Sequence, residues 1–370
     1  MVTTKIPRIV LTGGPCAGKS SAEMFLKKKF EAIGYCPVFV PEASTMLMNE
    51  GHTPLGGTKQ LREFQKRVID RILALELECE DELQRLAHPK PVIICDRGLM
   101  DGRAYMPEEM FWEVIAEHGL DLSNMRDARY LGVFHLRSTA LGAEEYYTQT
   151  NNKIRRETID EARLADERTL EAWIGHPHLR VIDNSGNSFD DKLEALWRHV
   201  SRLVGEPEPL EVERKFLVRL IDLRSIGIAH QTAEIEQIYL FAGDHSLPTR
   251  IRKRTQSGAS TCVQTVKRDI TPGVRHETET HISADEYADK AKLQDTRTLV
   301  IKKQRTCFVW NNQYFELDVF EKPYKDLCLL EIELINVDDI VDIPPWIEVI
   351  KEVTDDPAYS NHALASQRVP

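Results

Sequence analysis

The chain has 370 residues, 42% of them hydrophobic and 29% charged, which is the composition of a globular protein with room for two domains. Its formal net charge of −11 argues against general nucleic-acid binding, because that function needs a basic surface. We see no run of about 18 apolar residues that would cross a membrane and no basic and apolar leader, so we expect a cytoplasmic protein.

Seven cysteines are spread along the chain without any Cys-Xaa-Xaa-Cys spacing. An odd number of cysteines without that spacing indicates neither a zinc site nor a disulfide framework. We therefore expect the protein to work in a reducing compartment.

The first predicted strand, residues 8–12, runs directly into a glycine-rich loop, and a helix is expected from about 19 to 32. The strand is an apolar run suited to a parallel sheet that is buried on both faces. The loop reads Gly-Xaa-Xaa-Xaa-Xaa-Gly-Lys-Ser, whose backbone amides close around phosphate oxygens, while its lysine and serine serve the phosphates and magnesium. The residues expected to bind ATP are Gly13, Gly14, Pro15, Cys16, Ala17, Gly18, Lys19 and Ser20, with Ser20 also a magnesium ligand.

Further strands are expected at 38–40, 92–95, 131–134 and 180–182. Helical stretches near 58–87, 107–118, 153–174 and 188–204 separate them. This alternation predicts an α/β fold, a doubly wound parallel sheet with right-handed crossovers, over residues 1–204. Ligands of such sheets bind at the carboxyl ends of the strands.

Three features fall at those carboxyl ends. Asp96 follows an apolar strand, where it would face magnesium or merely cap a helix, and Glu42 is a general base for an acceptor hydroxyl or a loop carboxylate. Arg155 and Arg156 occupy an arginine-rich helix, where Arg156 would neutralise a transferring phosphoryl group or lie on a solvated face.

With these motifs, residues 7 to about 204 resemble the kinase-like P-loop ATPases related to nicotinamide riboside, deoxynucleoside and thymidylate kinases. The resemblance implies ATP as a ligand or substrate. No acceptor-specific motif is present in the sequence, so the acceptor stays open.

Residues 205–209, Gly-Glu-Pro-Glu-Pro, interrupt both periodicities and hold two prolines that a helix interior would not accommodate. We interpret them as a short, semi-stiff linker to a second domain, residues 210–370.

The second half shows charged residues spaced by two in successive predicted strands. They are Glu211, Glu213 and Lys215; Arg250, Arg252 and Arg254; Glu277 and Glu279; Lys303 and Arg305; Glu316 and Asp318; Glu331 and Glu333. Residues two apart in a strand share a face, and an ordinary half-exposed sheet would explain any one strand. Because the sign changes from strand to strand, the set together favours a barrel of about eight strands whose charged lumen holds a phosphate chain and a divalent cation.

This ordered series resembles the CYTH superfamily, the triphosphate tunnel metalloenzymes, over residues 210 to 362. The resemblance implies an α+β fold with an antiparallel eight-stranded tunnel barrel. It also implies metal-binding carboxylates at Glu211, Glu213, Glu331 and Glu333, with Asp318 as a further acidic lumen residue that joins these metal ligands. The cations that grip the phosphate chain would be Lys215, Arg250, Arg252, Lys267 and Arg305, whereas Glu277 and Glu279 match a less uniform acidic strand.

After Pro344-Pro345 we expect a helix near 346–353, and then a tail that lies against the tunnel mouth or frays. The function we expect is hydrolysis of inorganic tripolyphosphate or an organic triphosphate with Mg²⁺ or Mn²⁺, joined to an ATP-binding kinase-like domain. Two alternatives stay open. One is a small-molecule kinase whose barrel acts as an accessory phosphatase or pyrophosphatase, and the other is a sensor that binds nucleotide or polyphosphate without turnover. The pattern does not indicate the oligomeric state or coupling between the sites.

Overall fold

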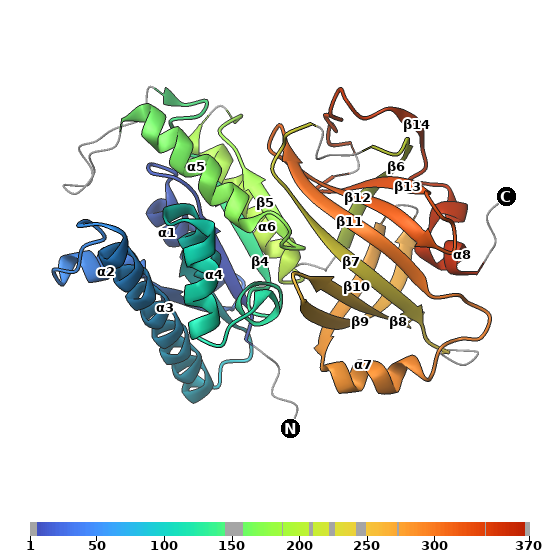
Figure 1. Ribbon diagram of the computed structural model, residues 1–370, viewed down its shortest axis with the longest axis horizontal. Helices are drawn as coiled ribbons and strands as arrows, with labels where there is room; N and C mark the ends of the chain where they lie inside the picture. Colours follow the sequence, from blue (N-terminus) through green and yellow to red (C-terminus); the bar gives the residue numbers. More distant parts are fainter. Residues whose placement is uncertain are drawn as a thin grey trace. The chain divides into compact units, whose positions relative to one another are not determined.

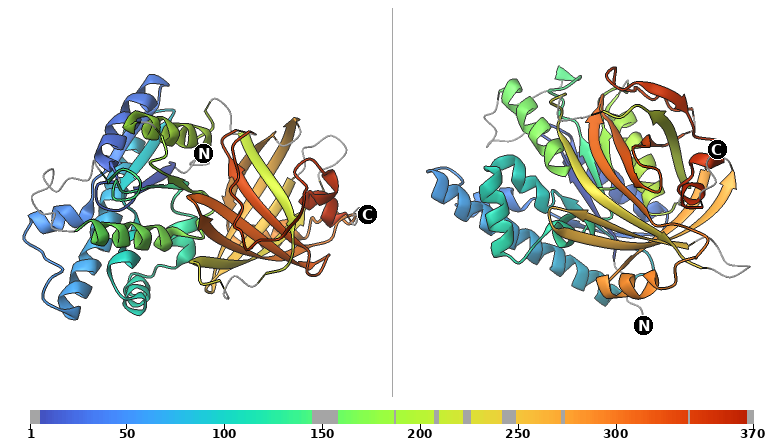
Figure 2. Two further views of the ribbon diagram at one scale, coloured as in Figure 1. Left: turned by 90° about the horizontal axis from the view of Figure 1, so that it is seen from above. Right: turned by 45° about the vertical axis from the view of Figure 1, so that its right-hand side comes forward.

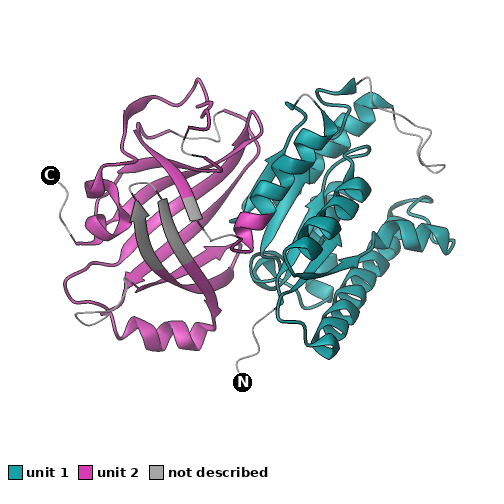
Figure 3. Ribbon diagram, turned by 180° about the vertical axis from the view of Figure 1, so that it is seen from behind, with its two compact units in different colours: residues 1–200 teal, residues 201–370 magenta. Residues whose placement is uncertain are grey.

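A computed structural model describes residues 6–144, 158–186, 188–206, 210–221, 226–241, 249–271, 274–336 and 338–366, but not the side chains of 210–211, 267–271 and 274–277. The chain divides into two compact units, Met1–Val200 and Ser201–Pro370 (Figure 3). In the described ranges, no helix combines the length and the apolar character needed to cross a membrane. All seven cysteines are free thiols.

The first unit contains a five-stranded sheet in the order β2-β3-β1-β4-β5, with every neighbouring pair parallel. The strands are β1 (Arg8–Thr12), β2 (Cys36–Val40), β3 (Pro91–Asp96), β4 (Gly132–Leu136) and β5 (Leu179–Ile182). Every residue of the central strands β1 and β4 is buried, which explains their continuous apolar sequence. The doubly wound parallel fold predicted for this half is confirmed.

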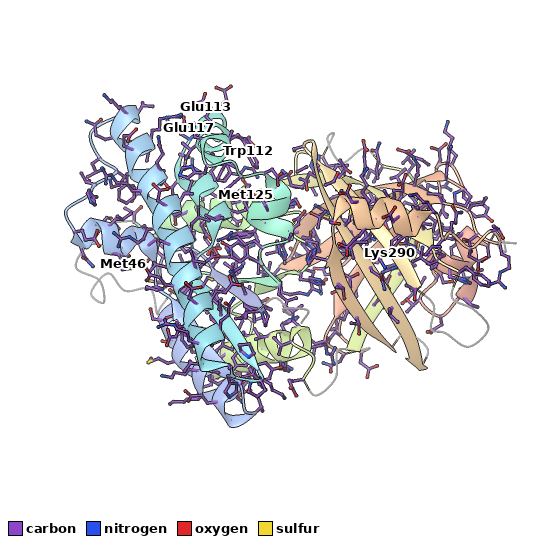
Figure 4. The ribbon with its side chains drawn as sticks, turned by 90° about the horizontal axis from the view of Figure 1, so that it is seen from below. Met46, Trp112, Glu113, Glu117, Met125 and Lys290 are labelled. Atoms are coloured by element: carbon purple, nitrogen blue, oxygen red, sulfur yellow. The ribbon has the colours of Figure 1, made fainter. Side chains whose placement is uncertain are left out.

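Helices cover both faces of this sheet (Figure 1). They are α1 (Lys19–Ala32), α2 (Ala43–Asn49), α3 (Thr58–Leu86), the 3-10 helix η1 (Leu99–Tyr105), α4 (Glu108–Glu117), the π-helix η2 (Ser123–Asp127), α5 (Ile159–Trp173) and α6 (Phe189–Leu203). Phe30 of α1 and Trp197 of α6 meet edge to face with ring centroids 5.2 Å apart. Glu113 and Glu117 of α4 lie one turn apart (Figure 4). Both pair with Arg62 of α3, so a charged contact joins these two helices.

The second unit is an antiparallel sheet in the order β10-β9-β8-β7-β11-β12-β13-β6-β14. Its strands are β6 (Leu210–Val218), β7 (His230–Tyr239), β8 (Thr249–Gln256), β9 (Ala259–Thr271), β10 (Val274–Ile282), β11 (Ile301–Trp310), β12 (Gln313–Lys322), β13 (Cys328–Leu334) and β14 (Val349–Glu352). A further pairing of β10 with β6 joins Val274 to Val212 and Arg275 to Glu211. Ladder pairings therefore run around eight strands, as a tunnel barrel requires, and the strands curl accordingly in Figure 2.

The two faces of these strands differ in character. Phe216, Leu330 and Ile332 belong to an apolar cluster with Phe308 and Phe315, and they alternate along the strands with charged residues. Because successive side chains point to opposite faces, the charged residues share the other face. At one end of that second face a second apolar cluster forms, in which Leu329 and Phe320 pack with Leu364 and Ala365 of α8 (Asn361–Ala365). The described part of the tail, through α8, thus packs on the barrel.

The helix predicted near 346–353 is wrong. Residues Val349–Glu352 form strand β14, which pairs with β6 at Phe216 to Val218. Before this strand, Ile347 is buried and Trp346 packs against the apolar cluster around Phe308, so the chain is anchored there in a turn. β-Branched Val349 and Ile350 suit a strand, and the pairing edge of β6 beyond its contact with β10 accepts it.

Candidate functional site

The glycine-rich loop of the first unit leads from β1 into α1 as the sequence predicts. Gly13 and Gly18 have φ angles of 145° and 86°, a region that favours glycine. A Cβ on Gly13 would lie 2.2 Å from the Leu136 carbonyl oxygen, and one on Gly18 would lie 2.6 Å from the Phe189 ring. Both glycines are therefore needed for the close approach of neighbouring elements.

Three consecutive carbonyls of this loop are bonded to the surrounding protein. The Ser138 hydroxyl donates to the Pro15 oxygen, and the Thr139 amide donates to the Cys16 oxygen at 3.3 Å. The buried ammonium of Lys192, on α6, donates to the Ala17 oxygen at 3.2 Å. With the carbonyls held on the protein side, the arrangement favours an anion on the amide side.

Burial lowers the pKa of Lys192 to about 8. Its ammonium also donates to the side chain of Asn184 at 2.8 Å and to the Arg137 carbonyl. This lysine lies beneath the loop and was not predicted, since it is an isolated lysine on the amphipathic helix α6.

Lys19 lies among acidic side chains at the start of α1. Its ammonium is 3.6 Å from the Asp96 carboxylate, so the predicted phosphate cation and the predicted magnesium ligand come together. Burial raises the pKa of Asp96, and burial together with the Asp96 charge raises the pKa of Glu23 to about 7. Glu23, one turn after Lys19, is a member of this cluster that sequence reasoning missed.

Glu42 is engaged by its neighbours. Its carboxylate accepts from Arg97 Nε at 2.7 Å and from the Thr45 hydroxyl at 2.8 Å. Burial alone would raise its pKa, but the charges of Arg97 and Lys19 outweigh it and lower the pKa of Glu42 to about 2. Arg97 also donates to buried Asp101 at 3.0 Å, so Glu42 belongs to an ion-pair network. A low pKa makes it a weaker proton acceptor than an ordinary glutamate.

Asp166 of α5 is a fully buried residue that sequence reasoning missed. It contacts the Gly14 and Ser138 amides and the side chains of His135 and Arg137. A signal was present, because Asp166 occupies the apolar stripe of α5 with Ala162, Thr169 and Trp173. The predicted lid arginines Arg155 and Arg156 lie outside the described residues.

In the second unit, Lys215 of β6 lies between two predicted metal-binding carboxylates. Its ammonium is 3.1 Å from Glu213 and 2.8 Å from Glu331 of β13, and the Lys215 and Glu331 side chains are each 9% exposed. Burial would lower the pKa of Lys215, but the two carboxylates raise it above its usual range. Glu333 stands directly opposite Glu213 in the strand register.

Arg305 of β11 is the centre of a second group. Its guanidinium contacts Asp318 at 2.6 Å, Glu331 at 2.8 Å and also Glu316. Burial would raise the pKa of Glu331, but Lys215, Lys303 and Arg305 lower it well below its usual range. One carboxylate, Glu331, therefore links both groups of charges.

Lys303 extends this network toward the tail. Its ammonium pairs with the fully buried Asp318, and it donates at 3.3 Å to the side-chain oxygen of Asn361 in α8. Burial lowers the pKa of Lys303. Its position on the charged strand face was visible in the sequence, but no role had been assigned to it.

The arginines of β8 belong to the same charged face of the barrel. Arg252 lies 3.2 Å from Glu279 of β10, and Glu279 also accepts from the Thr265 hydroxyl at 2.9 Å. The Glu279 charge would raise the pKa of Arg252, but burial, Arg250 and Arg305 lower it. Arg250 is buried.

Two residues of the predicted set have side chains outside the described part of the structure, Glu211 and Lys267. Their backbones stand opposite Arg275 and Glu277 of β10 in the strand pairing. Glu277 also lies outside the described side chains. These three roles stay predictions.

Among the side chains that the structure describes, no group of three acidic, histidine or cysteine residues is close enough to hold a metal ion. Glu213 and Glu331 nevertheless converge on one cation, the Lys215 ammonium. Carboxylate oxygens are the donors that Mg²⁺ and Mn²⁺ prefer. Glu213 and Glu331 have the chemistry that a divalent cation requires, and their metal role stays a prediction.

Two family models match the chain: an AAA domain at residues 8–191 and a CYTH domain at residues 209–341. No curated protein matches. One solved structure, described as the inorganic triphosphatase NE1496, is 28% identical, covering 42% of this chain and 94% of its own, with a TM-score of 0.32. Protein PH1819 from Pyrococcus horikoshii OT3 is 21% identical over 33% of this chain and 76% of its own, with a TM-score of 0.27. A putative adenylyl cyclase from Hippeastrum, described as having dominant triphosphatase activity, is 18% identical over 34% of this chain and 79% of its own, with a TM-score of 0.25.

Proposed function

We propose that this chain, which joins a P-loop domain of the AAA type to a CYTH domain, hydrolyses a triphosphate in its barrel and binds ATP at its P-loop. The predicted substrates of the barrel are inorganic tripolyphosphate or an organic triphosphate, with Mg²⁺ or Mn²⁺ as the metal. Both resemblances seen in the sequence are confirmed by the family matches.

One observation carries the barrel proposal: the shared carboxylate of Glu331. It pairs with Lys215 on one side and Arg305 on the other, and all three side chains are largely buried. A buried network of opposite charges is poor evidence for a stability role, because desolvation offsets much of its attraction. It is well suited to an anionic ligand, which would take over the cations and release the carboxylates.

The residues divide into three tasks in this proposal. The phosphate oxygens are bound and neutralised by Lys215, Arg250, Arg252, Lys267 and Arg305. The electrostatic attraction is stronger in a partly buried site than in water. Glu211, Glu213, Glu331 and Glu333 would hold the divalent metal, which would polarise the terminal phosphoryl group and orient a water. Asp318 was predicted as a metal ligand, but it is fully buried between Lys303 and Arg305, so we assign it to positioning these cations instead.

The experiment is a phosphate-release assay on tripolyphosphate, pyrophosphate, ATP and thiamine triphosphate, each with Mg²⁺ or Mn²⁺. We expect release from a triphosphate that EDTA abolishes and added metal restores. Release that persists in EDTA contradicts the metal assignment. Binding of tripolyphosphate without any release supports the sensor alternative instead.

For the first unit the proposal is ATP binding, with Lys19 and Ser20 at the phosphates and magnesium and Asp96 beside them. The proximity of Lys19 to Asp96 supports it. A kinase reaction would further need a base for the acceptor, and the network that lowers the pKa of Glu42 disfavours that residue in the base role.

A further inference from the structure

We propose that Asp166 is a positioning residue of the ATP site, which fixes the P-loop by holding Gly14 from outside the loop. This inference rests on the proposed ATP binding of the first unit. In this proposal Asp166 acts through the backbone of the loop and not through Lys19.

The two oxygens of Asp166 have separate partners. Oδ1 accepts from the Gly14 amide at 2.8 Å and from the Ser138 amide at 2.9 Å. Oδ2 contacts Arg137 Nη1 at 3.0 Å and His135 Nε2 at 3.1 Å. One oxygen thus serves the backbone of two loops, and the other is held by the strand β4 and the residue after it.

These contacts close a ring around the first part of the P-loop. Asp166 binds the amides of Gly14 and Ser138, and the Ser138 hydroxyl donates to the carbonyl of Pro15, the residue after Gly14. A rotation of the Gly14-Pro15 segment would therefore break contacts at both ends of the ring. Asp166 and Ser138 together fix the orientation of the Gly14-Pro15 peptide, at the start of the phosphate-binding loop.

The packing at Gly14 shows how closely this position is fitted. A Cβ on Gly14 would lie 2.7 Å from the Asp166 Cβ and 2.9 Å from its Oδ1. The first variable position of the Gly-Xaa-Xaa-Xaa-Xaa-Gly-Lys-Ser motif is thus a glycine because α5 lies directly against it. The motif alone does not require glycine there.

A buried carboxylate destabilises the folded state unless it is paired, and an apolar residue would fill this stripe of α5 at a lower cost in free energy. The contact with His135, the charge of Arg137 and the Gly14 amide lower the pKa of Asp166 despite its burial, so it stays ionised. An ionised carboxylate accepts stronger hydrogen bonds from amides than a neutral group does. This explains why a charged residue occupies a place that packing alone would give to leucine.

The test compares Asp166→Ala with Glu167→Gln in the full-length chain. Glu167 is the matched control, because it pairs with the same Arg137 Nη1 at 2.7 Å but its side chain is 47% exposed. Calorimetry measures the Kd for Mg²⁺-ATP. Only the binding event that disappears in the Lys19→Ala variant is assigned to the P-loop. We expect Asp166→Ala to weaken this binding by about tenfold or more and Glu167→Gln by less than about twofold.

Circular dichroism melting separates a loss of fold from a loss of positioning. If Asp166→Ala does not fold, Asp166→Asn keeps the size and one acceptor oxygen but places an amide donor against Arg137. We expect it to bind ATP about threefold more weakly than Glu167→Gln. A folded Asp166→Ala protein, or failing that Asp166→Asn, with the affinity of the control overturns the proposal and leaves Asp166 a core residue. If the wild type itself has no binding component that Lys19→Ala removes, the proposed ATP site fails and this inference falls with it.

Discussion

The two proposed phosphate sites of this chain are built in opposite ways. The P-loop uses eight consecutive residues, and its backbone is fixed by Ser138, Thr139, Lys192 and Asp166. The barrel site uses side chains from separate strands, with Lys215 and Arg305 sharing Glu331.

The two sites differ in how their binding groups are held in place. In the P-loop, the carbonyls are held by the surrounding protein, which leaves the amide side arranged for an anion. In the barrel, carboxylates neutralise the cations, and a ligand of the proposed site would have to compete with those carboxylates. The first site is therefore sensitive to what anchors its backbone, and the second to the removal of a single charge.

The largest effect is expected from Glu331→Gln. The change removes a proposed metal donor and the carboxylate shared by Lys215 and Arg305, so we expect tripolyphosphate hydrolysis to fall by about a thousandfold. The Kd for ATP at the P-loop is expected to stay within about twofold of the wild-type value, because changes at distant sites act independently. Phosphate-release rates and calorimetry check both statements. Wild-type release from a folded Glu331→Gln protein would remove Glu331 from the site.

Lys19→Ala is the complementary change. We expect the affinity for Mg²⁺-ATP to fall by about ten- to a hundredfold, because a charge-assisted contact to phosphate is lost. Hydrolysis of tripolyphosphate should continue, since the barrel residues belong to the other compact unit. Calorimetry and phosphate release on the same preparation check this. Loss of both activities in a folded protein contradicts two independent sites.

Arg252→Ala tests a cation at the margin of the barrel network. Arg252 pairs with Glu279 at 3.2 Å, but the two side chains are 19% and 30% exposed. Because solvent screens this pair, its loss is expected to change the melting temperature without ligand very little. The melting shift caused by tripolyphosphate and Mg²⁺ is expected to shrink, because about 1.5–3 kcal/mol of binding is removed. An unchanged ligand shift would place Arg252 outside the phosphate site. A large destabilisation without ligand would make it a structural ion-pair partner.

The smallest effect is a pH dependence at the P-loop. Burial and Asp96 raise the pKa of Glu23 from 4.5 to about 7, so between these values the folded state keeps a proton that the unfolded state has lost. Stability from this group is present below pH 4.5 and is lost as the pH rises toward 7. Glu23→Gln removes the dependence, so its melting temperature relative to wild type is expected to rise between about pH 5 and pH 8. A constant difference would show that Glu23 titrates normally.

The sequence predicted the first unit well where local signals were strong. Helix α1 has the predicted bounds, Lys19–Ala32, because a glycine at φ 86° precedes it and the loop motif fixes its start. The four other strands lie where apolar runs indicated them. Asp166 was missed because its role depends on Gly14, 152 residues away in the sequence.

In the barrel, the spacing of charges showed which residues share a strand face but not which ones touch. That Lys215 stands opposite Glu331, and Glu213 opposite Glu333, follows from strand register. Register depends on connections and on packing of the opposite face, which a period of two does not reveal. Strand β14 was mistaken for a helix because its strand character depends on the edge of β6 beside it.

The pairing of β6 also sets the order in which the barrel can be completed. β6 is the first barrel strand to leave the ribosome, yet its partners β10, β13 and β14 are all made later. Arg214 and Glu352, which clasp β6 to β14, are 138 residues apart. Pairings over such separations close long loops and form slowly compared with local contacts. Until the last of these strands emerges, β6 has open edges that can recruit other chains. The proposed barrel site therefore forms only after β13 has been made, and the nascent barrel is exposed to misassembly until then.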